Sequence, residues 1–222
     1  MDEFERLLRK YERVDKDGRP IKTRHEGELS YRAIGEQEEF VRIPKERVAV
    51  LIGRNGSTKK ELEDRTKTKV EVDSETGEVF ITSTKETEDP LAVWKARDIV
   101  TAIGRGFSPE RAFRLFNEGE VLEVLNLSDV VVGSEGNALP RVRGRIIGRK
   151  GRTREIIEEM SGADVSVYGK TVAIIGSPLQ VEIAKTAIEK LVKGSPHSSV
   201  YRYLERRKKD LEVEGAGYTL ME

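Results

Sequence analysis

The chain has 222 residues, and its 40 Lys and Arg residues are balanced by 40 Asp and Glu residues. A nucleic-acid partner would therefore have to be held by local basic patches and not by a uniformly basic surface. There is no cysteine and there are only two histidines, which excludes disulfides, thiolate zinc sites and cysteine nucleophiles and argues against a histidine metal centre. We expect no metal and no cofactor.

The chain also lacks the sequence features of membrane and secreted proteins. No apolar run approaches the roughly 18 residues of a membrane-spanning helix, and the acidic start Met1–Phe4 is unlike a signal peptide. We therefore expect a soluble, cytoplasmic protein.

Residues 1–36 are predicted to form an N-terminal helix and loop. Phe4, Leu7, Leu8 and Tyr11 recur at helical spacing, which indicates an amphipathic helix. Such an apolar stripe most often packs on its own protein, and docking to a partner is the alternative.

An internal repeat organises the rest of the chain. Residues Leu51–Lys59 are matched 95 residues later by Ile146–Arg154, and the match continues without a gap to Val72 and Val167. Two copies of one unit explain the length. The predicted domains are residues 37–117, a first unit with an extra C-terminal helix, residues 118–194, a second unit, and residues 195–222, a basic C-terminal helix and tail.

Each copy is predicted to contain, in order, a strand, a helix, a glycine turn, a helix, two strands and a helix. In the first copy the segments are Phe40–Ile43, Pro44–Ile52, Gly53–Gly56, a helix to about Arg65, strands near residues 70–72 and 79–81, and a long helix capped by Asp89 with Pro90 at its first position. Ser108–Pro109 is predicted to open the extra helix. Trp94 lies mid-helix among apolar residues, which favours a core position over a stacking platform for bases.

The second copy has the same order of elements. Its segments are a strand within Leu122–Val132, helices at Pro140–Ile147 and Thr153–Met160, strands at residues 165–167 and 172–174, and a final helix opened by Ser177–Pro178. Because no flexible Gly/Ser stretch separates the copies, we expect them to pack into one body.

The glycine turns suggest a chemistry for this unit. A helix that ends in Gly, two residues and a second Gly that opens the next helix let a phosphodiester chain approach the backbone closely. The N–H groups and positive dipole end of the second helix then favour phosphate. Seven basic residues and no acidic one lie between Arg141 and Arg154. Gly133–Gly136 has the same glycine spacing but is acidic, and it is interpreted as a plain loop.

Ile-Gly-x-x-Gly within such a unit resembles the eukaryotic-type (type I) KH domain, which clamps about four nucleotides of single-stranded RNA or DNA. The tandem arrangement resembles the archaeal and eukaryotic KH-repeat ribosome-assembly factors of the Dim/Pno family. The residues that carry this resemblance are Arg141–Arg154, Leu191–Pro196 with Val200–Tyr201 after it, and Ala102–Ser108.

The resemblance implies an α+β fold with two β-α-α-β-β-α domains, each a three-stranded sheet packed on helices, plus terminal helices. It implies binding to the 3′ region of small-subunit rRNA during subunit maturation. It also implies two protein partners, the endonuclease that trims this rRNA end and the alpha subunit of translation initiation factor 2. In a eukaryotic cell the location would be nucleolar or pre-ribosomal.

The RNA-binding candidates are the two turns and their flanks. Arg141, Arg143 and Arg145 cannot all face one way on a helix, so we expect one of them to be structural. Lys59 and Arg154 stand where most KH domains place an aliphatic residue, which predicts grooves that are more electrostatic than usual. The candidates are Gly148, Arg149, Lys150, Gly151, Arg152, Thr153, Arg154, Arg141, Arg145, Ile147 and Val167 in the second copy, and Gly53, Arg54, Asn55, Gly56, Lys59 and Lys60 in the first.

Three alternative functions were compared with RNA binding. Adjacent acids such as Glu158–Glu159 point in different directions on a helix, and the Gly-x-x-x-x-Gly-Lys spacing of a nucleotide-triphosphate loop is absent, so we expect no enzymatic activity. A protein–protein adaptor with KH folds as scaffolding stays open. An RNA-degradation factor is less favoured because no run of five short strands suggests an S1-type barrel. The basic, aromatic stretch from His197 to Lys209 is either a further RNA contact or a solvated helix.

Overall fold

The computed structural model describes residues 37–130 and 138–219. The predicted N-terminal stripe and the acidic loop Gly133–Gly136 lie outside the described residues. The elements are β1 (Glu38–Arg42), α2 (Lys45–Ile52), η1 (Arg54–Gly56), α3 (Ser57–Thr66), β2 (Thr68–Val72), β3 (Glu78–Ser83), α4 (Ala92–Gly104), α5 (Pro109–Ala112), η2 (Phe113–Phe116), β4 (Val121–Asn126), α6 (Leu127–Val130), α7 (Ala138–Ile147), η3 (Arg149–Gly151), α8 (Arg152–Ser161), β5 (Asp164–Tyr168), β6 (Thr171–Gly176), α9 (Pro178–Val192) and α10 (His197–Thr219).

The strands form two antiparallel sheets of the same design. Each has three strands, in the orders β1-β3-β2 and β4-β6-β5. Val70 pairs with Ile81 in the first sheet and Val165 pairs with Ile174 in the second, so the registers of the two copies match. The α+β class and the element order predicted from the repeat are confirmed.

Two predictions about the helix α4 were wrong. The helix begins at Ala92 and not at Pro90, because Asp89 accepts the N–H groups of Leu91 (2.8 Å) and Ala92 (3.1 Å) in a turn that precedes it. Trp94 is not a core residue, since 47% of it is exposed. The buried stripe of α4 includes Val93 and Ala96, and Trp94 lies about 100° away from Val93 around the helix.

The strand predicted within Leu122–Val132 is shorter than expected. It ends at Asn126, and the chain turns directly into the short helix α6. The Asn126 side-chain oxygen accepts the N–H of Ser128 at 3.1 Å, so a local side-chain contact competes with continuation of the strand.

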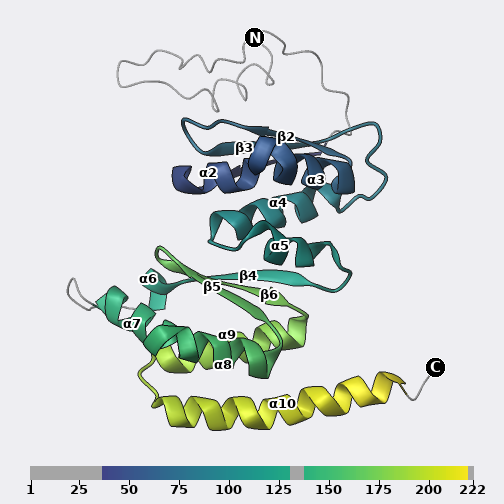
Figure 1. Cartoon of the computed structure of the whole chain (residues 1–222). Helices are drawn as coiled ribbons and strands as arrows, with labels where there is room; N and C mark the ends of the chain where they lie inside the picture. The colour runs from purple at the N-terminus through teal and green to yellow at the C-terminus, as the bar shows by residue number, and fades with distance from the viewer. Residues whose placement is uncertain (1–36, 131–137, 220–222) are drawn as a thin grey trace, which may run out of the picture. The chain divides into compact units, whose positions relative to one another are not determined.

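The second sheet is covered on both faces. Val172 and Ile174 of β6 belong to one hydrophobic core, and Ala173 and Ile175 belong to the other, which is built mainly from the first copy. Figure 1 shows α4 and α5 between the two sheets, with α7, α8 and α9 on the far face of the second one. All six residues of β6 are therefore buried, whereas burial alternates along β3.

Polar contacts also join the two copies. The Ser166 hydroxyl donates to the carbonyl of Arg105 at 2.9 Å, and the Tyr168 hydroxyl donates to the Glu46 carboxylate at 2.6 Å. A Cβ on Gly106 would lie 2.8 Å from the Ser166 hydroxyl oxygen, so only glycine allows this approach. The expectation that the copies pack into one body is confirmed. In the part of the chain described here, no helix is long and apolar enough to cross a membrane.

Candidate nucleic-acid interface

Both glycine turns adopt the same backbone conformation. Gly53 and Gly148 have φ of 75° with ψ of 176° and 175°, a region that is essentially restricted to glycine. The residue before the second glycine, Asn55 or Lys150, is left-handed with φ of 54° or 55°. Asparagine tolerates this conformation better than lysine does, so the second turn holds Lys150 under some backbone strain.

The two glycines of each turn have different surroundings. A Cβ on Gly148 would lie 2.2 Å from Oγ1 of Thr153, and a Cβ on Gly53 would lie 2.3 Å from Oγ1 of Thr58. A Cβ on Gly151 would meet only a Glu155 oxygen at 3.8 Å, and one on Gly56 would meet nothing within 4 Å. The first glycine is therefore required by packing inside the protein, while the second leaves the outer side of the turn open.

The helices after the two turns begin on the open side, and the N–H of each first residue bonds to the turn: Ser57 to the Arg54 carbonyl and Arg152 to the Arg149 carbonyl. Gly56 is the N-cap of α3 and Gly151 is the N-cap of α8, and neither helix has a side-chain cap. The positive dipole end of each helix is still a favourable position for a phosphate group.

Exposed cations surround the second turn. Arg149 and Lys150 are exposed on η3, and Arg141 is exposed on α7. Arg152 lies 3.6 Å from Glu155 on the exposed surface. Among the described residues, Arg141, Arg149, Lys150 and Arg154 form no ion pair, so their charges are available to an anionic ligand.

The side chains of two predicted site residues make contacts within the protein. Arg145 donates to the carbonyls of Leu191 at 3.1 Å and Ser195 at 2.6 Å, which makes it the structural member of the arginine series. Thr153 is only 4% exposed, and its hydroxyl lies 3.1 Å from that of Tyr201 on α10. Both side chains are engaged inside the protein, and RNA binding by Arg145 and Thr153 stays a prediction.

A groove of about 470 Å³ lies beside the second turn. Arg154 and Ile147 form one side of it, and Val165 and Val167 of the edge strand β5 form another. Sequence reasoning missed the wall that comes from the first copy, which is the loop between α4 and α5 together with Arg111 of α5. The lining residues are Gly106, Phe107, Ser108, Arg111, Ile147, Gly151, Arg154, Val165, Ser166 and Val167.

The first turn has fewer available cations. Arg54 and Lys60 are exposed, but Lys59 lies 3.5 Å from Glu63 one helical turn later. Asn55 stands where the second copy has Lys150. The first turn thus has the same backbone geometry with less positive charge.

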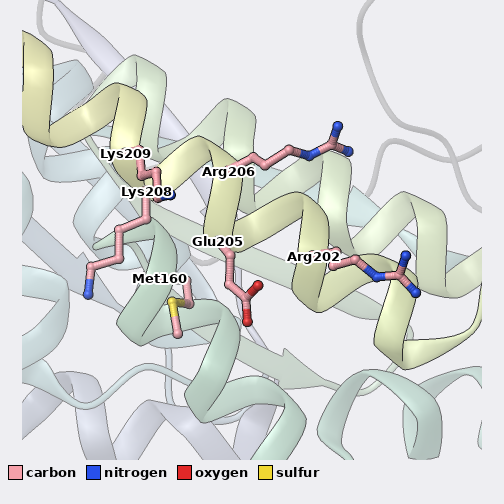
Figure 2. Close-up of a pocket in the computed structure, with 6 residues that line it drawn as sticks. All are labelled: Met160, Arg202, Glu205, Arg206, Lys208 and Lys209. Atoms are coloured by element: carbon pink, nitrogen blue, oxygen red, sulfur yellow. The ribbon is translucent and has the colours of Figure 1, made fainter.

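The helix α10 carries a second basic surface. Its residues and Met160 of α8 border a hollow of about 670 Å³, lined by Met160, Arg202, Glu205, Arg206, Lys208 and Lys209. Figure 2 shows Arg202 and Arg206 extending away from Met160. They are one helical turn apart, so their like charges repel each other. This geometry leaves both interpretations of the C-terminal segment open.

In the described ranges, no group of three or more His, Asp or Glu side chains could hold a metal ion. The site combines an open backbone at the glycine turn, exposed cations and a partly apolar groove, which is suited to binding a phosphodiester chain with its bases.

The comparisons with known proteins agree with this geometry. Residues 121–209 match the eukaryotic-type KH domain (KH-domain type I), and residues 38–100 match the KH domain. A KH domain-containing protein of Methanocaldococcus jannaschii is 48% identical over 174 residues, which is 78% of this chain and 75% of that protein. The chain belongs to the tandem KH-domain family that includes the Dim2 and PNO1 proteins.

Two further relatives of this family are informative. A chain in the crystal structure of an a/eIF2alpha–aDim2p–rRNA complex from Pyrococcus horikoshii OT3 is 78% identical, with a TM-score of 0.76, covering 80% of this chain and 97% of that one. The pre-rRNA-processing protein pno1 of Schizosaccharomyces pombe is 31% identical over 136 residues. That match covers 61% of this chain and 56% of the pno1 protein, so it spans little more than half of that relative.

Proposed function

We propose that this protein is a non-enzymatic, single-stranded RNA-binding factor that acts in rRNA processing and binds the 3′ region of small-subunit rRNA. The observation that carries the proposal is the second glycine turn, where unpaired Arg149 and Lys150 flank an open backbone beside a groove. The pre-rRNA-processing name of one relative and the rRNA in the complex of another support the choice of RNA. The protein would act in the cytoplasm, or in nucleolar pre-ribosomes if it is eukaryotic.

The RNA would lie with its backbone along Gly148–Gly151 and its bases in the groove against Ile147 and Val167. About four to six neutralised phosphates would give a log–log salt slope near −3 to −4 for a single strand. The first repeat would contribute less, because its turn has fewer free cations. We further propose the alpha subunit of initiation factor 2 as a protein partner, since the complex from Pyrococcus horikoshii contains it. The 3′-end endonuclease stays a prediction from the family resemblance.

The test is fluorescence anisotropy with a short RNA copied from the small-subunit rRNA 3′ end, with a scrambled strand and a duplex as competitors. The Arg149→Asp/Lys150→Asp variant should bind about 30- to 150-fold more weakly, or about 2–3 kcal/mol. A Lys85→Asp/Lys193→Asp variant changes the same charge on exposed residues outside the turn, and it should bind like the wild type. Circular dichroism checks that both variants fold.

Equal binding by the wild type and the turn variant would refute RNA binding at this site. Equal binding of the rRNA strand and the scrambled strand would refute only the preference for the 3′ end.

The second candidate function is a protein–protein adaptor, and one observation favours it. Phe40 on β1 is 49% exposed, and the centroid of its ring lies 5.2 Å from that of Phe80 on β3. Exposed aromatic residues are enriched at protein interfaces. An adaptor would show little RNA affinity at any salt concentration. Phe40→Ser would then weaken binding to the alpha subunit of initiation factor 2.

A further inference from the structure

The two repeats contain equivalent glutamates that do the same structural work. Glu63 accepts the N–H of Val70 at 2.8 Å, and Glu158 accepts the N–H of Val165 at 2.8 Å. In each repeat the carboxylate thus ties the helix after the glycine turn to the edge strand of the sheet. The glutamates also stand one helical turn after Lys59 and Arg154 respectively, a spacing at which oppositely charged side chains pair.

Only the first repeat forms this pair. Lys59 lies 3.5 Å from Glu63, whereas Arg154 has no acidic partner among the described residues. In the second repeat, Glu158 pairs instead with Arg111 of α5. The same guanidinium donates to Asp164 at 2.6 and 3.0 Å. Arg111 belongs to the extension of the first repeat, so the first repeat supplies the cation that occupies this glutamate.

A second arginine from the same extension completes the arrangement. Arg114 lies 3.2 Å from the other carboxylate oxygen of Asp164 and donates to the Gly162 carbonyl at 2.9 Å. Glu158 and Asp164 are therefore both paired with cations of the first repeat. The Arg154 side chain is left to line the groove beside Gly151 and Ile147.

Resting on the proposed RNA-binding function, we propose that Arg111 is a positioning residue for RNA. Arg111 forms an ion pair with the Glu158 carboxylate. This pair prevents Glu158 from pairing with Arg154, so Arg154 can pair with a phosphate in the groove of the second repeat. The RNA site is composite, because the first repeat prepares the groove of the second without using its own glycine turn. This also explains why the two turns, with the same backbone geometry, would differ in affinity for RNA.

The proposal is tested by a double-mutant cycle of Arg111→Met and Glu158→Gln in the full-length protein. RNA binding is measured as a function of salt concentration with the rRNA 3′-end strand. In R111M, Glu158 becomes free to pair with Arg154, so one phosphate contact is lost. The salt slope should become shallower by about 0.7, and the affinity should fall about 3- to 10-fold at low salt.

The rescue separates positioning from direct contact. In E158Q the new amide can still accept the Val165 N–H but cannot form an ion pair, so this variant alone should bind within about twofold of the wild type. In R111M/E158Q, Arg154 is free again, and the wild-type slope should return. If R111M weakens binding and the double variant does not recover, Arg111 contacts RNA directly or only holds the fold, and the proposal is wrong. Melting temperatures of all variants show whether packing between the repeats has changed.

Arg154→Met distinguishes failure of this inference from failure of the proposed function. If R154M weakens RNA binding while R111M does not, the positioning role is refuted and RNA binding by the second repeat stands. If neither of these variants nor Arg149→Asp/Lys150→Asp changes RNA binding, both the inference and the proposed function are wrong. Lys95→Met is the control in the first repeat, because Lys95 lies outside both turns and is paired with Asp89 at 3.5 Å, so its loss should have little effect on the slope.

Discussion

Replacing Gly148 by alanine should damage the protein far more than replacing Gly151, although both glycines belong to one motif. Gly148 has φ of 75° and ψ of 175°, where a residue with a Cβ is strained by about 1–3 kcal/mol. The new methyl group would also lie 2.2 Å from Oγ1 and 2.8 Å from the backbone nitrogen of Thr153. Overpacking of this kind adds about 1–3 kcal/mol, so we expect a total near 4 kcal/mol.

Gly151 presents a different situation. Its φ is 83° and its ψ is −1°, close to the left-handed region in which alanine is destabilised by about 1 kcal/mol. Its Cβ would meet no atom closer than 3.8 Å. For a chain of this size, about 1 kcal/mol lowers the melting temperature by about 2–4 °C. Gly148→Ala should therefore lower it by about 8–16 °C, and Gly151→Ala by about 2–4 °C.

Thermal unfolding monitored by circular dichroism measures both changes, and the first repeat provides an internal replicate. Gly53→Ala should behave like Gly148→Ala, and Gly56→Ala like Gly151→Ala, because the distances repeat. Equal melting temperatures for the two variants of one turn would refute the packing argument. RNA binding distinguishes the packing role of Gly148 from a ligand-contact role of Gly151. Gly151→Ala should weaken RNA binding more than its small loss of stability explains. Unchanged RNA binding by a folded Gly151→Ala variant would refute a close approach of RNA to this backbone.

Three further predictions rest on the geometry of single residues. Lys150→Asn should raise the melting temperature by about 1–4 °C, because asparagine tolerates φ of 55° better than lysine does. The salt slope of RNA binding should become shallower by about 0.7, because one cation is lost. A lower melting temperature would contradict the backbone strain at this position. Tyr168→Phe should remove a pH-dependent contribution to stability. The Tyr168 hydroxyl lowers the pKa of Glu46 below its usual 4.5, so this contribution is present above about pH 4.5 and lost as the pH falls through the lowered pKa. The same contact raises the pKa of Tyr168 above 10.0, so the contribution is also lost as the pH rises through that raised pKa. The melting temperatures of the Tyr168→Phe variant and the wild type should therefore converge at low and at high pH. A difference in melting temperature that stays constant across pH would exclude this contact. Trp94→Ala should cost less than about 1 kcal/mol, whereas Ile99→Ala should cost about 2–4 kcal/mol, because only the isoleucine is buried; comparable losses in urea unfolding would place Trp94 in the core after all.

The repeated turn made most of the fold predictable from the sequence. A glycine pair between helices and alternation in the strands after them are local signals, and they occur twice with the same spacing. Trp94 was mispredicted because composition around a helix does not give orientation, and a shift of one position moves a side chain by about 100°. The stripe of Val93, Ala96 and Val100 contained the correct information.

The composite groove could not be predicted in this way. Arg111 and Glu158 are 47 residues apart in the sequence, and their contact exists only because the two repeats dock. One signal for the docking was present. Val172–Ile175 is an uninterrupted apolar run, which is typical of a strand covered on both faces. The apolar run of the equivalent strand β3 is one residue shorter, Val79–Ile81, and burial alternates along that strand.

The packing of one repeat on the next joins different surfaces, the helical layer of the first to the outer sheet face of the second. Such head-to-tail contacts do not close on themselves and could in principle continue. The segment after the last helix of each repeat decides whether they do. After α4 the short segments α5 and η2 join the next sheet, whereas after α9 the long helix α10 packs on α8 and α9. The helix α10 thus covers part of the helical layer of the second repeat, in the way that capping elements cover the last unit of linear repeat proteins.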